Sequence, residues 1–91
     1  MSQPNIVFIL TDQERHFDVW PEGFDVPGRR RLQEAGTTFT NHMIASCVCT
    51  PSRSTIYGGQ HIQRTTVFDN VNFPWANDLP QDMRTIGHRL R

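Results

Sequence analysis

The two side chains best suited to chemistry are Cys49 and Arg53, which lie four positions apart in the segment 49–59, CTPSRSTIYGG. Pro51 is typical of the start of a helix, and the glycine pair at 58–59 is typical of its end, so we expect Cys49 at a helix N-terminus. The free backbone amides at such a terminus, and a guanidinium one turn further on, both favour anions. The pattern therefore predicts an oxyanion-binding site, although a lone cysteine before a helix is more often buried and inert.

A second candidate is the pair Asp12 and Gln13, which directly follows the apolar run Ile6–Leu10. This run is continuous and rich in β-branched side chains, which is typical of a strand buried on both faces of a parallel sheet. Open α/β sheets gather ligand-binding groups at the carboxyl ends of their strands, where a carboxylate suits a hard cation. Asp12 is therefore a candidate metal ligand, and the alternative is an aspartate that only forms a turn or a cap.

The elements that must position these residues are short and alternate between strand and helix patterns. Besides the strand over 6–10 and the helix that opens at Pro51, we expect a helix from Asp25-Val26-Pro27 to Gly36 and a brief strand over 37–40. An irregular stretch over 60–84 with a short strand at 65–68 follows, and then a helix capped by Thr85 that carries Ile86 and Leu90. This order predicts the α/β class, with a sheet that has more strands than residues 1–91 supply.

The charge and the hydropathy of the chain exclude several classes of protein. Nine arginines, with no lysine, balance nine acidic residues, so the net charge is +0, and 36% of the residues are hydrophobic. Because there is no basic patch, neither nucleic acid nor an anionic membrane is an expected partner. The longest apolar run falls short of the roughly 18 residues that a membrane span needs, and no positive charge precedes it, so we expect a cytoplasmic protein.

Cys47 and Cys49 are separated by one residue, which makes a disulfide between them geometrically awkward and favours free thiols. An alternative interpretation is a small binding module whose two thiolates take a soft metal or act as a redox pair. Zinc and iron–sulfur sites normally use four ligands at wider spacing, and the four histidines show no such spacing. This alternative is therefore disfavoured.

At these residues the chain resembles the sulfatase family of the alkaline-phosphatase-like superfamily. The family signature, Cys-x-Pro-Ser-Arg followed by an apolar pair and a glycine, is matched within 49–59. The segment 4–12, PNIVFILTD, is similar to the family's first strand and first metal-binding aspartate. The segment 36–41, GTTFTN, is similar to the segment before the nucleophile, and residues 85–91 are similar to the next helix. The resemblance implies that residues 1–91 are the N-terminal piece of a catalytic domain, a three-layer α/β/α fold with a mainly parallel sheet.

One position separates branches of this family. Many members carry a second aspartate where this chain has Gln13, and the Asp-Gln form is similar to the branch of choline sulfatases and phosphonate monoester hydrolases. That branch implies that Asn70 contacts the oxyanion of the substrate, and Gln13 is a second candidate for substrate binding. The alternative for Asn70 is a loop residue that satisfies backbone groups.

The resemblance also implies a reaction. Cys49 would be oxidised by a maturation enzyme to formylglycine, whose hydrated aldehyde attacks a small-molecule sulfate ester with one hydroxyl and later expels sulfate with the other. Asp12 and the residue derived from Cys49 would hold a divalent metal, for which Ca²⁺ is the first choice and Mn²⁺ or Mg²⁺ the alternatives. Arg53 would hold the nucleophile's second oxygen and the charge of the oxyanion.

Two further alternatives stay open from the sequence. A phosphonate or phosphodiester hydrolase could use the same formylglycine, because sulfate and phosphate esters share tetrahedral geometry. An inactive fragment is the other alternative, because 91 residues are few for a catalytic domain of this kind.

Overall fold

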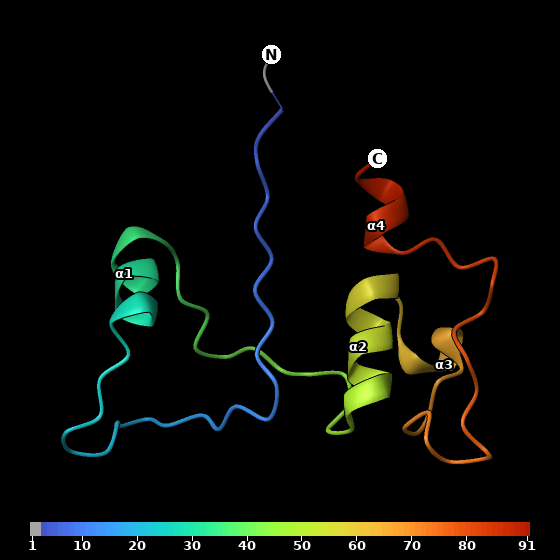
Figure 1. Ribbon diagram of the computed structural model, residues 1–91, viewed down its shortest axis with the longest axis horizontal. Helices are drawn as coiled ribbons and strands as arrows, with labels where there is room; N and C mark the ends of the chain where they lie inside the picture. Colours follow the sequence, from blue (N-terminus) through green and yellow to red (C-terminus); the bar gives the residue numbers. More distant parts are fainter. Residues whose placement is uncertain (1–2) are drawn as a thin grey trace. The chain divides into compact units, whose positions relative to one another are not determined.

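The computed structural model describes residues 3–91 and divides the chain into two compact units, Met1–Thr38 and Phe39–Arg91. Within the described residues, Figure 1 shows helix α1 (Pro27–Ala35) in the first unit and helices α2 (Cys49–Gly58), α3 (Ile62–Thr65) and α4 (Ile86–Arg89) in the second. No residue between 3 and 91 belongs to a β-strand. Over the same residues, no helix has the length and apolar character required to cross a bilayer.

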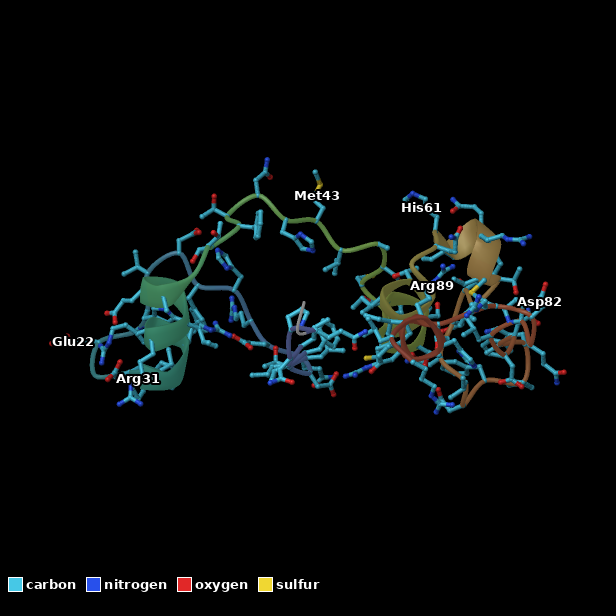
Figure 2. All side chains as sticks on the ribbon, turned by 90° about the horizontal axis from the view of Figure 1, so that it is seen from above. Glu22, Arg31, Met43, His61, Asp82 and Arg89 are labelled. Atoms are coloured by element: carbon cyan, nitrogen blue, oxygen red, sulfur yellow. The ribbon has the colours of Figure 1, made fainter. Side chains whose placement is uncertain are left out.

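Helix α1 confirms the sequence prediction. It begins with a proline in its first turn, where the missing N–H costs nothing, and it ends before Gly36. The guanidinium of Arg30 donates to both carboxylate oxygens of Asp25, at 3.0 and 3.2 Å, which fastens the helix to the segment before it. No residue of α1 is buried, and side chains such as Arg31 project outward (Figure 2).

Aromatic side chains organise the rest of the first unit. The Trp20 ring lies between Phe17 and Phe24, with centroid distances of 5.1 and 5.3 Å. The Arg29 guanidinium lies 5.6 Å from the centre of the Trp20 ring and forms an ion pair with Glu14. These contacts connect the loop after residue 13 with the first turn of α1.

The strand expected over Ile6–Leu10 is not formed. The segment is extended (Figure 1), but it pairs with no other described residue, and its side chains are 37 to 83% exposed. A strand is stabilised by its hydrogen-bonded neighbours, so an apolar run alone gives only an extended chain. The expected strand over 37–40 is also absent, and the α/β class therefore stays a prediction.

Helix α2 is the centre of the second unit and contacts both α3 and α4. It buries Pro51, Ser54 and Gly58, which recur every three or four residues and so share one face. The Ser54 hydroxyl donates to the Pro51 carbonyl at 2.7 Å and contacts the hydroxyl of the fully buried Thr65 at 3.2 Å. This face of α2 therefore packs through polar contacts rather than through a large apolar core.

The end of α2 depends on its two glycines. A Cβ on Gly58 would lie 2.8 Å from the sulfur of Met83, so a side chain there would displace the methionine. Gly59 caps the helix in the left-handed conformation, with φ 62°, and its N–H donates to the Thr55 carbonyl at 2.9 Å. The predicted end of the helix is thus confirmed, and its start lies two residues before the expected Pro51.

Helix α3 was not predicted, because the stretch 60–84 was expected to be irregular apart from a strand at 65–68. The structure has one helical turn here and no strand. The turn ends at Thr66, which adopts a left-handed φ of 59° and donates its N–H to the Ile62 carbonyl at 2.8 Å. Thr65 and Val67 on either side are buried, and Val67 is 1% exposed. These two residues are the centre of the small core.

Helix α4 confirms the predicted cap at Thr85. The Thr85 N–H donates to Nδ1 of His88 at 3.2 Å, and the Thr85 hydroxyl lies 2.8 Å from the same nitrogen. The imidazole therefore takes the place of the glutamate in the usual capping box. Arg89 is the last residue of the helix, and Leu90 follows it as the C-cap.

Candidate active site

Cys49 is the first residue of α2 and so lies at a helix N-terminus, as the sequence predicts, and its side chain is exposed as a free thiol. The preceding Val48 has an extended backbone, and its N–H donates to the Ser46 hydroxyl at 3.1 Å. The Val48 carbonyl accepts the N–H of Ser52 at 3.0 Å, which closes the first turn. The thiol therefore lies beside backbone amides that have no acceptor within the helix itself.

Arg53 follows Cys49 by four residues and so shares its face of α2. This face lies away from the one that buries Pro51, Ser54 and Gly58, so packing of the helix leaves it accessible. Arg53 is half-buried. A guanidinium placed one turn from a group at a helix N-terminus can pair with a bidentate oxyanion held there.

Asn70 reaches the same turn from a distant part of the chain. Its side-chain Oδ1 accepts the backbone N–H of Thr50, the second residue of α2, at 3.0 Å. Val48 at the N-cap position offers no side-chain acceptor, and Asn70 supplies the missing one. The structure thus brings three of the sequence-predicted site residues, Cys49, Arg53 and Asn70, to the first two turns of α2.

Two residues that the sequence analysis missed, Asp69 and Trp75, form hydrogen bonds next to Asn70. The Asp69 carboxylate accepts the N–H of Asn70 at 2.8 Å and the indole N–H of Trp75 at 2.9 Å. These bonds, led by that from Trp75, lower the pKa of Asp69 below its ordinary value. No local pattern marks such a pair, because the two residues are six positions apart in a segment without helix or strand.

The other predicted residues, Asp12 and Gln13, belong to the first unit. Gln13 has a positive φ of 48°, a conformation that is uncommon outside glycine and that often marks a functional position. The neighbouring Glu14 has a lowered pKa, because the Thr11 hydroxyl and then Arg29 bond to its carboxylate. Asp12 and Cys49 belong to different units, and a shared site for them stays a prediction.

The donors present suit a hard cation but do not complete a site. Asp12 and Gln13 offer carboxylate and amide oxygens, the ligand type that Ca²⁺ and Mg²⁺ prefer. Among residues 3–91, no three histidine, cysteine, aspartate or glutamate side chains are grouped closely enough to hold a metal ion. The same finding gives no support to a soft-metal site built on Cys47 and Cys49.

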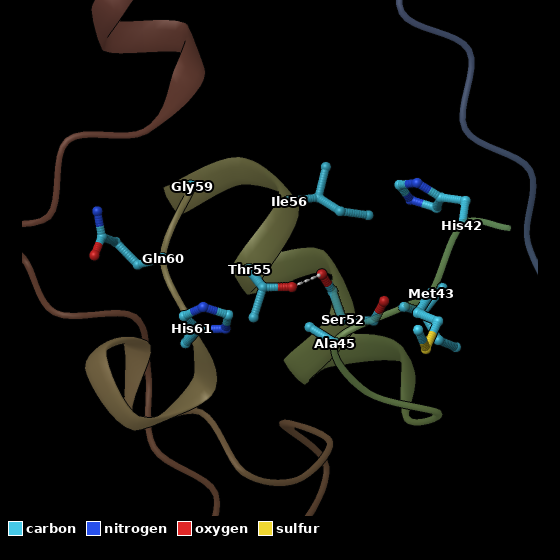
Figure 3. Close-up of a pocket in the computed structure, with 10 residues that line it drawn as sticks. His42, Met43, Ala45, Ser52, Thr55, Ile56, Gly59, Gln60 and His61 are labelled. Carbon is cyan, nitrogen blue, oxygen red and sulfur yellow. Dashed lines mark hydrogen bonds between the residues drawn. The ribbon is translucent and has the colours of Figure 1, made fainter. Parts of the chain in front are cut away.

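A pocket of about 280 Å³ lies on a different face of α2 (Figure 3). Its walls come from the segment before α2, from α2 itself and from the turn after it, and they are formed by His42, Met43, Ile44, Ala45, Ser52, Thr55, Ile56, Gly59, Gln60 and His61. Thr55 donates its hydroxyl to the Ser52 carbonyl at 2.7 Å inside this wall. Neither Cys49 nor Arg53 nor Asn70 lines it, so this pocket is distinct from the candidate site.

Comparison with known proteins agrees with the motif at α2. The family model described as Sulfatase matches residues 4–91. Arylsulfatase J of Mus musculus is 31% identical over 93 aligned positions, which cover 99% of this chain and 15% of the relative. An ulvan-active sulfatase of Formosa agariphila is 32% identical over 72 positions, which cover 76% of this chain and 14% of the relative. Arylsulfatase K of Danio rerio is 28% identical over 92 positions, which cover 96% of this chain and 18% of the relative.

The chain therefore belongs to the sulfatase family. It spans between 14 and 18% of the length of these three relatives. No solved structure matches the chain significantly.

Proposed function

We propose that the complete protein hydrolyses sulfate esters and that Cys49, after oxidation to formylglycine, supplies the nucleophile. The observation that carries this proposal is the position of Cys49: an exposed thiol at the first residue of α2, with Arg53 on the same face and Asn70 bonded to the same turn. Family membership supports the reaction class. The substrate is a small molecule with a sulfate ester, and a maturation enzyme is the required partner.

The N-terminus of α2 and the Arg53 side chain can stabilise negative charge on the substrate. During attack at sulfur, negative charge develops on the sulfuryl oxygens, and donors fixed in advance stabilise it at no cost of reorganisation. The Arg53 guanidinium is such a donor, because α2 holds it, and the positive end of the helix dipole lies at the same terminus. Arg53 offers two parallel N–H groups where a lysine offers a single point charge.

Asn70 has an orientation that fits a substrate-binding role. An amide oxygen that accepts the Thr50 N–H leaves the NH₂ group of the same amide as a donor. That donor lies beside the turn that carries Cys49, where the oxyanion of the substrate is held in this proposal. Asn70 thus caps the helix with one end of its amide and binds the substrate with the other.

Asp12 is the proposed ligand of a divalent cation, for which Ca²⁺ is the first choice. When bound, such a cation lowers the pKa of an attacking hydroxyl and neutralises charge on the sulfuryl group. Gln13 offers a neutral oxygen and an NH₂ group, which suits contact with the substrate or with the ligands of the metal. The proposed setting for both is the edge of a mainly parallel sheet in a three-layer α/β/α domain.

The decisive experiment is mass spectrometry of the complete protein coexpressed with a formylglycine-generating enzyme. We expect the peptide that contains Cys49 to show replacement of CH₂SH by CHO and to react with a hydrazide probe, while Cys47 stays a thiol. Turnover of an aryl sulfate should disappear in Cys49→Ala, whereas Cys47→Ala is the matched control and should keep it. Full activity of Cys49→Ala would refute the proposal, and turnover of an aryl phosphonate in place of the sulfate would correct the substrate class.

Arg53 has its own test in the same protein. Arg53→Lys keeps the positive charge and loses the paired N–H groups, so kcat should fall by about 100-fold, as for the loss of one oxyanion donor. Arg53→Ala should lower turnover further and should also reduce conversion of Cys49, because the arginine belongs to the motif that the maturation enzyme recognises. An Arg53→Ala protein with normal turnover would remove this residue from the mechanism.

A further inference from the structure

The Asp69 carboxylate joins the two ends of a short loop. One of its oxygens, Oδ1, accepts the backbone N–H of the next residue, Asn70, at 2.8 Å. The other, Oδ2, accepts the indole N–H of Trp75 at 2.9 Å. Because each oxygen serves a different donor, the carboxylate fixes both the start and the end of the segment 69–75.

Two turns and a ring contact stiffen the residues between these ends. The N–H of Phe73 donates to the Asn70 carbonyl at 3.1 Å, and the N–H of Ala76 donates to the Phe73 carbonyl at 3.0 Å. The rings of Phe73 and Trp75 are stacked, with centroids 4.8 Å apart and an interplanar angle of 10°. Trp75 is 66% exposed, so its place is held by the hydrogen bond and the stacking rather than by burial.

This loop carries the residue that completes the candidate site. The Oδ1 atom of Asn70 accepts the Thr50 N–H at 3.0 Å across a separation of 20 residues. A donor that must bind an oxyanion works only within narrow limits of position and angle. The backbone N–H of Asn70 donates to the Asp69 carboxylate, and its carbonyl accepts the N–H of Phe73. These two bonds restrict the position and the angle of the Asn70 side chain.

We propose that Asp69 and Trp75 are positioning residues, which form a latch that holds Asn70 against the first turn of α2 so that its amide can bind the substrate. This inference deepens the proposed function and rests on it. The lowered pKa of Asp69 agrees with a carboxylate that is ionised and doubly bonded at neutral pH. Neither residue touches the substrate in this proposal, because both act through Asn70.

A double-mutant cycle in the complete protein tests the latch. Trp75→Phe keeps a ring that stacks on Phe73 and removes the indole N–H, so kcat/KM for an aryl sulfate should fall by about 10-fold through misplacement of Asn70. In an Asn70→Ala background, Trp75→Phe should cause no further fall. Asp69→Asn places an NH₂ group against the Asn70 N–H or the Trp75 indole N–H. It should likewise lower kcat/KM in the wild-type background and cause no further fall in the Asn70→Ala background. Asn77→Ala is the matched control, because it removes a hydrogen bond just beyond the loop, to the Thr66 carbonyl at 3.2 Å, and should stay within about 2-fold of the wild type.

A second measurement separates this inference from the proposed function. Exchange of the Thr50 amide hydrogen should be faster in Trp75→Phe and in Asp69→Asn than in the wild type, and unchanged in Asn77→Ala. The proposal would be refuted if the losses in kcat/KM from Trp75→Phe and Asn70→Ala multiplied in the double mutant. It would also be refuted if exchange of the Thr50 amide hydrogen were the same in Trp75→Phe as in the wild type. If the wild type hydrolyses no sulfate ester, the proposed function fails, and the exchange data still decide whether Asp69 and Trp75 hold Asn70.

Discussion

Asn70 has two tasks at the residue scale, and one substitution pair separates them. Asn70→Ala removes both the cap of α2 and the donor, so it should reduce turnover to a low but measurable level and lower the free energy of unfolding by about 1 kcal/mol. Asn70→Asp keeps an acceptor for the Thr50 N–H, so stability should stay near that of the wild type. Its negative charge should still abolish binding of a sulfate ester. Denaturant unfolding and steady-state kinetics on both variants check this. If Asn70→Asp were active, Asn70 would have a role in capping α2 and none in substrate binding.

Asp12 and Gln13 are expected to differ in their effect on a bound metal. In the complete protein, Asp12→Ala should remove the divalent cation together with turnover, because it deletes a charged ligand. Gln13→Ala should lower turnover while the metal stays bound, because a neutral amide contributes less to affinity. Metal content measured by mass spectrometry on both purified variants gives the answer. An active, metal-loaded Asp12→Ala protein would end the assignment of this ligand.

The latch at Asp69 should depend on pH in a defined direction. Since the folded-state pKa of Asp69 is lowered, its contribution to stability is present above the pKa of the unfolded chain and is lost as the pH falls through the folded pKa. The difference in stability between the wild type and Trp75→Phe should therefore exist at neutral pH and vanish in acid. Urea unfolding of both proteins across this range measures it. A difference that persists in strong acid would show that contacts of the indole other than its hydrogen bond to Asp69 carry the effect.

At the scale of elements, the sequence predicted what local signals encode. Proline and glycine mark α1 and the end of α2, and the spacing of Cys49 and Arg53 places both on one helix face. Helix α3 was missed because a single turn has no period to detect. The bond from Thr50 to Asn70 could not be predicted, because it links residues 20 positions apart and leaves no local pattern. The strand expected over 6–10 depends on neighbours that residues 3–91 do not provide.

The caps of α2 and α3 give a matched pair of stability predictions. Both Gly59 and Thr66 have left-handed backbones, with φ of 62° and 59°, and only glycine adopts this conformation without strain. Thr66→Gly should therefore raise the free energy of unfolding by about 1 kcal/mol, and Gly59→Ala should lower it by about the same amount. A Cβ on Gly59 would contact nothing within 4 Å, so the change in unfolding free energy of Gly59→Ala reports the backbone strain without a steric clash. Thermal unfolding of the complete protein checks both, and a stabilising Gly59→Ala would contradict the argument.

At the scale of the whole molecule, the described residues bury little apolar surface. Val67 is the buried hydrophobic side chain of residues 3–91, while Ile6–Leu10, Trp75 and many other large apolar side chains stay exposed. Burial of apolar surface is the main term that offsets the loss of chain entropy on folding. We therefore expect the 91-residue chain, expressed by itself, to lack a cooperative unfolding transition and to aggregate through its exposed apolar segment. Calorimetry of the purified chain measures this, and a sharp, reversible transition would contradict it.

The cap that Asn70 gives to α2 also has a consequence for the timing of protein synthesis. The cap and the helix that needs it are 20 residues apart, so a ribosome that adds 5–20 residues per second releases Thr50 roughly 1 to 4 seconds before Asn70. During that interval, the first turn of α2 lacks its side-chain acceptor, so the segment around Cys49 is less restrained than in the folded chain. In the proposed function, a maturation enzyme that acts on the unfolded motif thus has a period of access that ends when Asn70 binds the first turn. Slow codons between positions 50 and 70 would lengthen this period and raise the fraction of modified protein.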